Sequence, residues 1–130
     1  MTDLIATRHP HLHRLIEAWR THGGVVPAEA LRGREAPVAW LRLEDPGGWR
    51  IDAADARLAE LYGGAFVGES ARALSAGEEA AACEAQAADE TGREILVEAT
   101  LSLAGRRVRL ARLYLPLAAG EVLCAVATVA

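Results

Sequence analysis

The last third of the chain most constrains its fold. Residues 95–103 place apolar side chains at every second position, and these are Ile95, Val97, Ala99, Leu101 and Leu103. This two-residue period is typical of a β-strand that buries one face. Ala104-Gly105-Arg106 predicts a tight turn, and two further apolar strands are expected at 108–115 and 122–129. Consecutive strands joined by short turns favour antiparallel pairing.

A second strand block precedes the middle of the chain. Residues 38–44 alternate, with Leu41 and Leu43 on one face, and Asp45-Pro46-Gly47-Gly48 follows as a turn cluster. Residues 49–53 alternate again. The two runs therefore predict a β-hairpin.

Helical patterns lie before and between the strand blocks. Leu12, Leu15, Ile16 and Trp19 form the stripe of an amphipathic helix that begins near Pro10 and ends at Gly23-Gly24. Between the blocks, Asp55 is a suitable N-cap for a short helix ending at Gly63-Gly64. Ser75-Ala76-Gly77-Glu78 fits a capping box and predicts a helix from there to about Asp89, with Ala81, Ala85 and Ala88 facing inward and Cys83 nearby.

This element order predicts the fold class. Strand blocks at both ends of a helical middle give an α+β protein with an antiparallel sheet, and exclude a parallel doubly wound sheet. At 130 residues the chain is expected to form one compact unit. We divide it into residues 1–36, the N-terminal helix and connector, and residues 37–130, the core.

Charge and hydropathy exclude several classes. The net charge is −4 and all 14 basic residues are Arg, so the chain lacks the dense basic face of nucleic-acid binders. No run reaches the ~20 apolar residues of a membrane helix, and residues 1–13 do not resemble a signal peptide. We therefore expect no membrane contact and a cytoplasmic location, with Cys83 and Cys124 reduced.

Three strings resemble the PAS domain family, in particular short PAS domains of alphaproteobacterial type with an N-terminal helix. They are residues 12–20 followed by Gly23-Gly24 and Pro27, residues 60–70, and residues 113–118 followed by Gly120. The resemblance covers nearly the whole chain and implies a five-stranded antiparallel sheet with helices on one face and an N-terminal helical extension. It also implies sensing or protein–protein contact.

The resemblance further implies a small apolar pocket between the sheet and the middle helices. The candidate lining residues are Trp49, Ile51, Tyr62, Phe66, Leu74, Cys83, Tyr114 and Cys124. Core packing is the alternative interpretation of every one of them. A small apolar ligand would suit such a pocket.

Each candidate cofactor requires particular residues to hold it. Haem needs an axial ligand, but no His follows His22 and Met1 is the only Met. Photoreceptor-type flavin domains use a Cys within an Asn-Cys-Arg string, and this chain has no Asn, so we expect neither haem nor flavin. His9, His11 and His13 are spaced like metal ligands, but a solvated helix entrance explains them, and we expect no metal.

No catalytic constellation is evident, so we expect no enzyme activity. All four His lie before residue 23, away from Cys83 and Cys124. Two rivals stay open: a small cone-shaped α+β enzyme or carrier with a deep apolar pocket, and a ligand-free structural adaptor.

Two surfaces are candidates for partner binding. The stripe containing Leu12, Ile16 and Trp19 either caps the sheet or pairs with a second copy in a homodimer. The basic cluster Arg106, Arg107, Arg109 and Arg112 is expected to be a solvated strand edge. Arg107 and Arg109 would offer the contact for an acidic protein partner. Because the sequence ends with its last predicted strand, we expect a stand-alone signalling module that acts by association.

Overall fold

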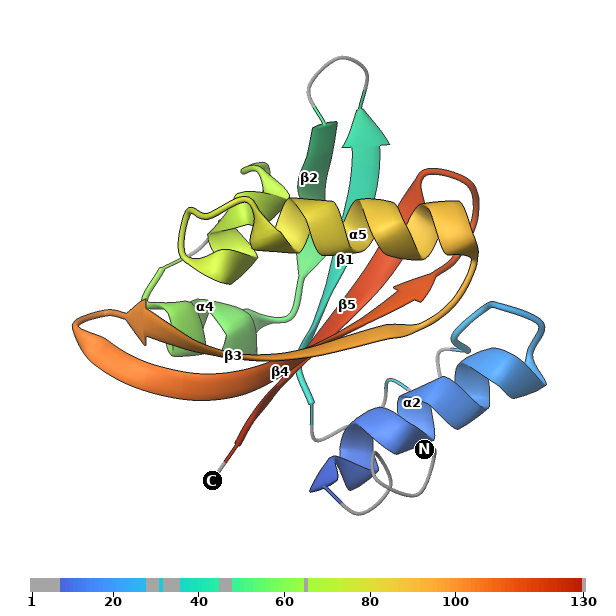
Figure 1. Cartoon of the computed structure of the whole chain (residues 1–130), viewed down its shortest axis with the longest axis horizontal. Coiled ribbons are helices and arrows are strands. Elements are labelled where there is room, and N and C mark those ends of the chain that lie inside the picture. Colours follow the sequence, from blue (N-terminus) through green and yellow to red (C-terminus); the bar gives the residue numbers. More distant parts are fainter. Residues whose placement is uncertain (1–7, 28–30, 32–35, 45–47, 65, 130) are drawn as a thin grey trace.

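A computed structural model describes residues 8–27, 31, 36–44, 48–64 and 66–129. Its described strands form one five-stranded sheet in the order β2-β1-β5-β4-β3 (Figure 1). The strands are β1 (Val38–Glu44), β2 (Gly48–Ala54), β3 (Ile95–Leu103), β4 (Arg106–Pro116) and β5 (Glu121–Thr128). Every pair is antiparallel, which confirms the predicted α+β class.

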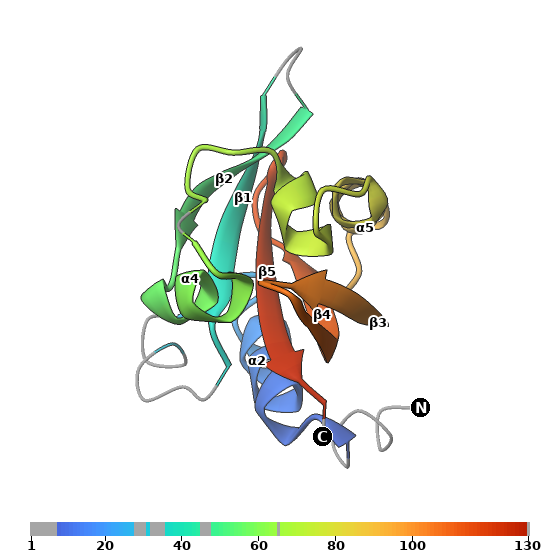
Figure 2. The ribbon, with the colours of Figure 1, turned by 90° about the vertical axis from the view of Figure 1, so that its left-hand side faces the viewer.

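Pairing of β1 with β5 joins the two strand blocks. Their register runs from Val38 opposite Ala125 to Arg42 opposite Glu121, so the hairpin and the three-strand block share one sheet as predicted. The β1–β2 hairpin extends beyond the helical layer in Figure 1 and Figure 2. Its predicted turn cluster lies outside the described residues at 45–47, and Gly48 already begins β2.

Three short elements cover one face of the sheet: α4 (Ala56–Tyr62), the 3-10 helix η1 (Ala71–Ser75) and α5 (Ala80–Thr91). Asp55 caps α4 as predicted, because its side chain accepts a hydrogen bond from the Arg57 backbone N–H. Gly63 ends the helix at φ 84°, a left-handed conformation that glycine adopts without strain. These elements and the sheet enclose the larger apolar core.

The predicted capping box at Ser75 does not begin α5 directly. Ala76 and Gly77 both have positive φ, so the chain turns there and α5 begins five residues after Ser75, at Ala80. Ser75 still serves the helix, because its hydroxyl accepts the Ala81 N–H at 3.1 Å and donates to the Glu78 carbonyl at 2.6 Å. The predicted inward face of Ala81, Ala85 and Ala88 is fully buried.

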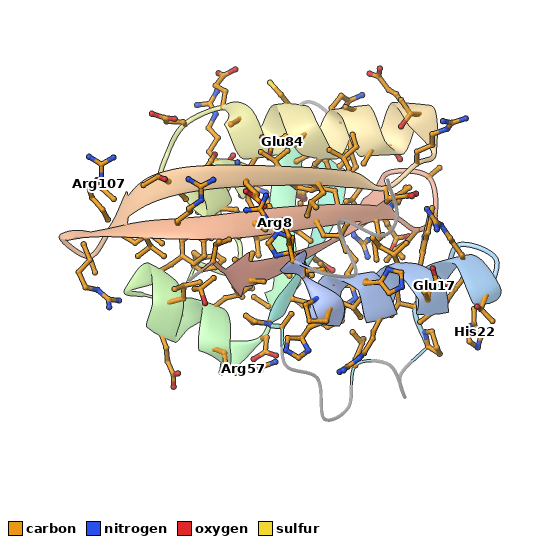
Figure 3. All side chains as sticks on the ribbon, turned by 60° about the horizontal axis from the view of Figure 1, so that its bottom comes forward. Arg8, Glu17, His22, Arg57, Glu84 and Arg107 are labelled. Atoms are coloured by element: carbon orange, nitrogen blue, oxygen red, sulfur yellow. The ribbon has the colours of Figure 1, made fainter. Side chains whose placement is uncertain are left out.

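The N-terminal helix α2 (Pro10–Thr21) packs on the opposite face of the sheet. Figure 3 shows it below the strands, with α5 above them. Its stripe packs into a second apolar core with strand residues of β1, β4 and β5, and the Trp19 indole donates to the Pro116 carbonyl at 2.7 Å. Of the alternatives for this helix, capping of the sheet is the one the structure shows.

From Leu110 onward, strand β4 is consequently buried on both faces. Leu110 and Tyr114 belong to the core under α5, while Leu113 and Leu115 belong to the core under α2. Successive side chains of a strand point to opposite faces, so β4 forms the wall shared by both cores. Within the described residues, no helix has the length and apolar character needed to cross a membrane.

Candidate functional site

The predicted pocket residues gather in one cluster, but they fill it. Trp49, Ile51, Phe66, Leu74, Tyr114 and Cys124 are all buried in the core between the sheet and the middle helices, and Tyr62 packs against them. Tyr62 meets Phe66 edge to face, with ring centroids 5.4 Å apart. Tyr62 and Phe66 also line an open cavity.

Cys83 is the exception and corrects the predicted lining. Its side chain is exposed. The buried face of α5 repeats at Ala81, Ala85 and Ala88, and Cys83 lies two residues from both Ala81 and Ala85. Two residues correspond to about 200° around a helix, so Cys83 points away from the sheet.

The cavity at Tyr62 is an open depression of about 380 Å³ at the end of the sheet. It lies where α4 and η1 meet the β3–β4 turn, and Phe66, Ala73 and Ala104 contribute to its wall. The Tyr62 hydroxyl is already engaged, because it donates a hydrogen bond to the Leu74 carbonyl at 2.8 Å.

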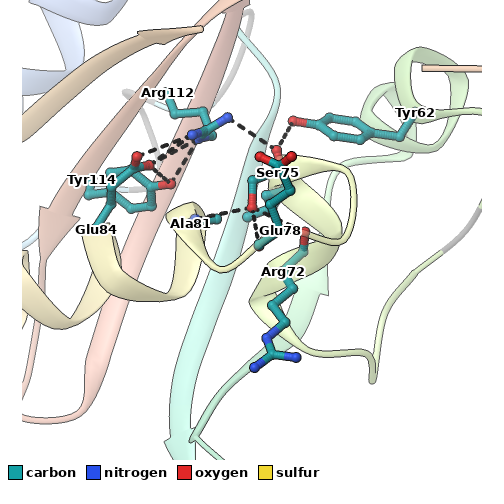
Figure 4. Close-up of polar contacts among 9 residues, drawn as sticks. Tyr62, Arg72, Ser75, Glu78, Ala81, Glu84, Arg112 and Tyr114 are labelled. Atoms are coloured by element: carbon teal, nitrogen blue, oxygen red, sulfur yellow. Dashed lines mark hydrogen bonds and ion pairs between the residues drawn. The ribbon is translucent and has the colours of Figure 1, made fainter. Parts of the chain in front are cut away.

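A buried polar network, which sequence reasoning missed, lies between β4 and α5 (Figure 4). Arg112 Nε and Nη2 bind Glu84 Oε1 at 3.1 and 3.0 Å, and Nη2 also reaches Oε2 at 3.2 Å. The Tyr114 hydroxyl donates to Glu84 Oε1 at 2.6 Å and accepts from Arg112 Nε at 3.0 Å. Arg112 Nη1 donates to the Leu74 carbonyl at 3.4 Å.

The network is almost closed to solvent. The side chain of Arg112 is 1% exposed, that of Glu84 is 17% exposed, and Tyr114 is fully buried. Burial raises the pKa of Tyr114 above its ordinary range, so its phenol stays protonated and donates to Glu84. Burial lowers the pKa of Arg112, but Tyr114 and Glu84 outweigh this effect, and the net pKa lies above its ordinary value. A charged guanidinium therefore sits inside the core.

The alternation of side chains along β4 could have indicated this network from the sequence. Arg112 lies two residues from Leu110 and two from Tyr114, hence on the same face of the strand. Grouping Arg112 with its basic neighbours as a solvated edge was wrong, because Leu110 and Tyr114 both face the α5 core and Arg112 is buried beside them. A charged residue at an inward position is buried only when paired, and Glu84 provides the partner.

A second polar cluster fastens α2 to the sheet. His9 Nε2 lies 2.8 Å from Glu98 Oε2, and Glu98 Oε1 also accepts from Arg8 at 3.1 Å and Arg109 at 3.3 Å. At the other end of α2, Arg20 pairs with Glu94. These contacts tie one end of the helix to β3 and the other to the residue just before β3.

The three histidines proposed as spaced like metal ligands are held separately. His9 meets Glu98, His13 lies 3.9 Å from Glu17, and His11 lies 3.4 Å from Arg14. Across the described part of the chain, no three His, Cys, Asp or Glu side chains are grouped as metal ligands.

The predicted partner residues divide into two sets. Leu12, Ile16 and Trp19 are at most 9% exposed and pack in the protein's own core, so an interface built on them requires α2 to leave the sheet. Arg107 and Arg109 are exposed, and Figure 3 shows Arg107 at the far end of the β3–β4 hairpin. Arg109 forms an ion pair with Glu98 of the neighbouring strand β3.

Comparison with known proteins rests on structure. No family model and no curated protein sequence matches this chain. A fungal LOV domain photoreceptor is 18% identical with a TM-score of 0.62, over 87% of this chain and 88% of that one. A structure from work on the light-oxygen-voltage domain mechanism with a flavin analogue is 16% identical with a TM-score of 0.59, over 89% and 84%. A domain of an HTR-like protein from Haloarcula marismortui is 17% identical with a TM-score of 0.49, over 73% and 98%.

These neighbours contradict the expectation on cofactors. We set flavin aside, yet two of these structures are LOV domains and one of them was studied with a flavin analogue. The absence of an Asn-Cys-Arg string therefore does not set flavin aside for a chain of this fold. In this chain Leu74, Arg112 and Tyr114 are buried between the sheet and the middle helices.

LOV domains are a subfamily of PAS domains. The sheet order, the helices on its two faces and the LOV neighbours together show that the chain has a PAS-like fold.

Proposed function

We propose that this chain is a sensory or signalling module, in which a change beneath α5 is passed through β4 to the docked helix α2. One observation carries the proposal: β4 is buried on both faces and joins the two helices. Arg112 and Tyr114 bind Glu84 of α5 on one face. Leu113 and Leu115 pack in the α2 core on the other.

The two sides of β4 are held by different forces. On the α5 side the helix packs through small Ala side chains, and the Glu84 network adds polar contacts to β4. On the α2 side, apolar packing and the Trp19–Pro116 hydrogen bond fix the helix to the same strand. A shift of β4 that follows loss of the network therefore changes the surface on which α2 rests.

Release of α2 would provide the surface for the association with a partner or a second copy that the sequence suggested. The stripe of Leu12, Ile16 and Trp19 becomes exposed only when the helix leaves the sheet, and an exposed apolar stripe of this size favours a protein partner or a second copy. The interface on these residues thus belongs to a released state. A cytoplasmic location and the lack of catalytic activity stay predictions from the sequence.

Hydrogen–deuterium exchange of the α2 amides tests the proposal. Arg112→Met removes the network, and Leu58→Ala, a buried position on α4, serves as a control of similar overall cost. We expect Arg112→Met to speed exchange in α2 beyond what its global stability accounts for, while Leu58→Ala does not. Equal protection of α2 in the two variants at matched stability would count against the proposal.

A further inference from the structure

We propose that the Glu84 carboxylate occupies a binding site for a small organic acid, and that the carboxylate of such an acid replaces Glu84 on Arg112 and Tyr114. The inference rests on the proposed function and deepens it by naming the class of ligand. It accounts for a buried charge pair at the point where α5 meets the shared strand.

The receptor half of the site is fixed. Arg112 and Tyr114 lie two residues apart on β4, at most 1% exposed, and together aim three donors at one carboxylate. A planar guanidinium fork matches the two oxygens of a carboxylate, which makes the recognition geometric as well as electrostatic. These donors remain in place whichever carboxylate they bind.

The occupant half is exchangeable. Glu84 comes from a different element, α5, and its side chain is 17% exposed, so it reaches solvent from its present position. Figure 3 shows Glu84 where α5 meets the strands. The helix packs through Ala81, Ala85 and Ala88, none of which depends on Glu84. Rotation of Glu84 outward would leave the helix able to stay in place.

The surroundings select the rest of the ligand. The core next to the network contains Leu74, Ala81 and Leu110, so an acid with a short apolar group gains burial that Glu84 does not provide. The guanidinium demands an anion, because an unpaired charge in this core is costly. Acetate and propionate are the smallest probes with both features.

The experiment titrates each protein with acetate and propionate and follows the NMR resonances of Arg112 and Tyr114. Chloride at matched ionic strength is the salt control. We expect Glu84→Ala to bind the acids at least tenfold more tightly than the wild-type chain, because the internal competitor is gone. Glu79→Ala, an exposed position immediately before α5, should bind like the wild type. Adding Arg112→Met to Glu84→Ala should abolish binding.

Two results would overturn the site: equal response of Glu84→Ala to acetate and chloride, or binding that survives Arg112→Met. If Glu84→Ala does not fold in chloride, folding restored by acetate supports the site. Glu84→Gln removes the competing charge and decides the remaining case, since acetate binding no tighter than in the wild-type chain contradicts the proposal. Acid binding that leaves α2 protection unchanged refutes the coupling through β4, but not the site.

Discussion

Tyr114 donates a 2.6 Å hydrogen bond to the same Glu84 oxygen that Arg112, two residues earlier on β4, binds at 3.0 Å. A single carboxylate thus ties α5 to two side chains of one strand. Because Arg112 is 1% exposed, loss of Glu84 would leave its charge without a partner in the core. This arrangement makes the network both a support of the fold and a point at which the fold can change.

Breaking the network from the arginine side should be costly. We expect Arg112→Met to lower the free energy of unfolding by about 3–5 kcal/mol, because a buried pair that loses one member leaves the other desolvated. Urea denaturation measures the loss. Arg107→Met removes an exposed guanidinium of the same strand and should change stability by less than about 0.5 kcal/mol.

Apolar replacement of both partners provides the second half of this test. Glu84→Met combined with Arg112→Met leaves no unpaired charge, so most of the lost stability should return. A double variant no more stable than Arg112→Met alone would contradict the account of the network as a paired buried charge.

The two cysteines should react very differently with a thiol reagent. Cys83 is exposed on α5, whereas burial raises the pKa of the Cys124 thiol to about 12. We expect one thiol to be titrated quickly in the native protein and the second only after unfolding in urea. Cys83→Ser should abolish the fast phase, and a fast phase that persists in this variant would place Cys124 at the surface.

Docking of α2 should weaken in acid. The hydrogen bond from His9, together with Arg109 and Arg8, holds the pKa of Glu98 below its ordinary value of 4.5. A carboxyl whose pKa is depressed by folding stabilises the folded state above the unfolded pKa, and this stabilisation is lost as the pH falls through the folded pKa. Hydrogen exchange of α2 should therefore accelerate below about pH 4.5.

Glu98→Gln is the variant that isolates this effect. It should loosen α2 at neutral pH and flatten the acid response, whereas Glu79→Gln, whose native carboxylate pairs with exposed Arg72, should leave the response unchanged. An acid response of α2 that is the same in Glu98→Gln and the wild type would assign it to another group.

Most of the fold could be predicted from local periodicity in the sequence. The alternation from Ile95 to Leu103 and the turn at Gly105 predict the β3–β4 hairpin, which the structure contains. The sharing of one sheet by the two strand blocks followed from the economy of burying two alternating faces, whereas the specific pairing of β1 with β5 was not predicted. The start of α5 did not follow, because Ser75 has the sequence of a cap while the positive φ of Ala76 and Gly77 displaces the helix.

The candidate site was harder to predict, because a charged residue is normally expected at the surface. Arg112 lies on the same face of β4 as Tyr114. An arginine close to three others in the sequence is nevertheless expected to be solvated unless its partner is known. That partner, Glu84, is 28 residues away on another element. The prediction for Cys83 was wrong for a simpler reason. Its apolar character suggested burial, but the helical period of the buried alanines places Cys83 on the exposed side of α5.

A double-mutant cycle between Arg112→Met and Trp19→Phe tests the coupling across β4 most directly. The two side chains lie on opposite faces of the sheet and share no hydrogen bond, so independent sites would add within about 0.3–0.5 kcal/mol in urea denaturation. We predict an interaction free energy larger than about 0.5 kcal/mol for this pair, and additivity for Leu58→Ala with Trp19→Phe. Additivity in both cycles would contradict the claim that β4 connects the network under α5 to the docking of α2.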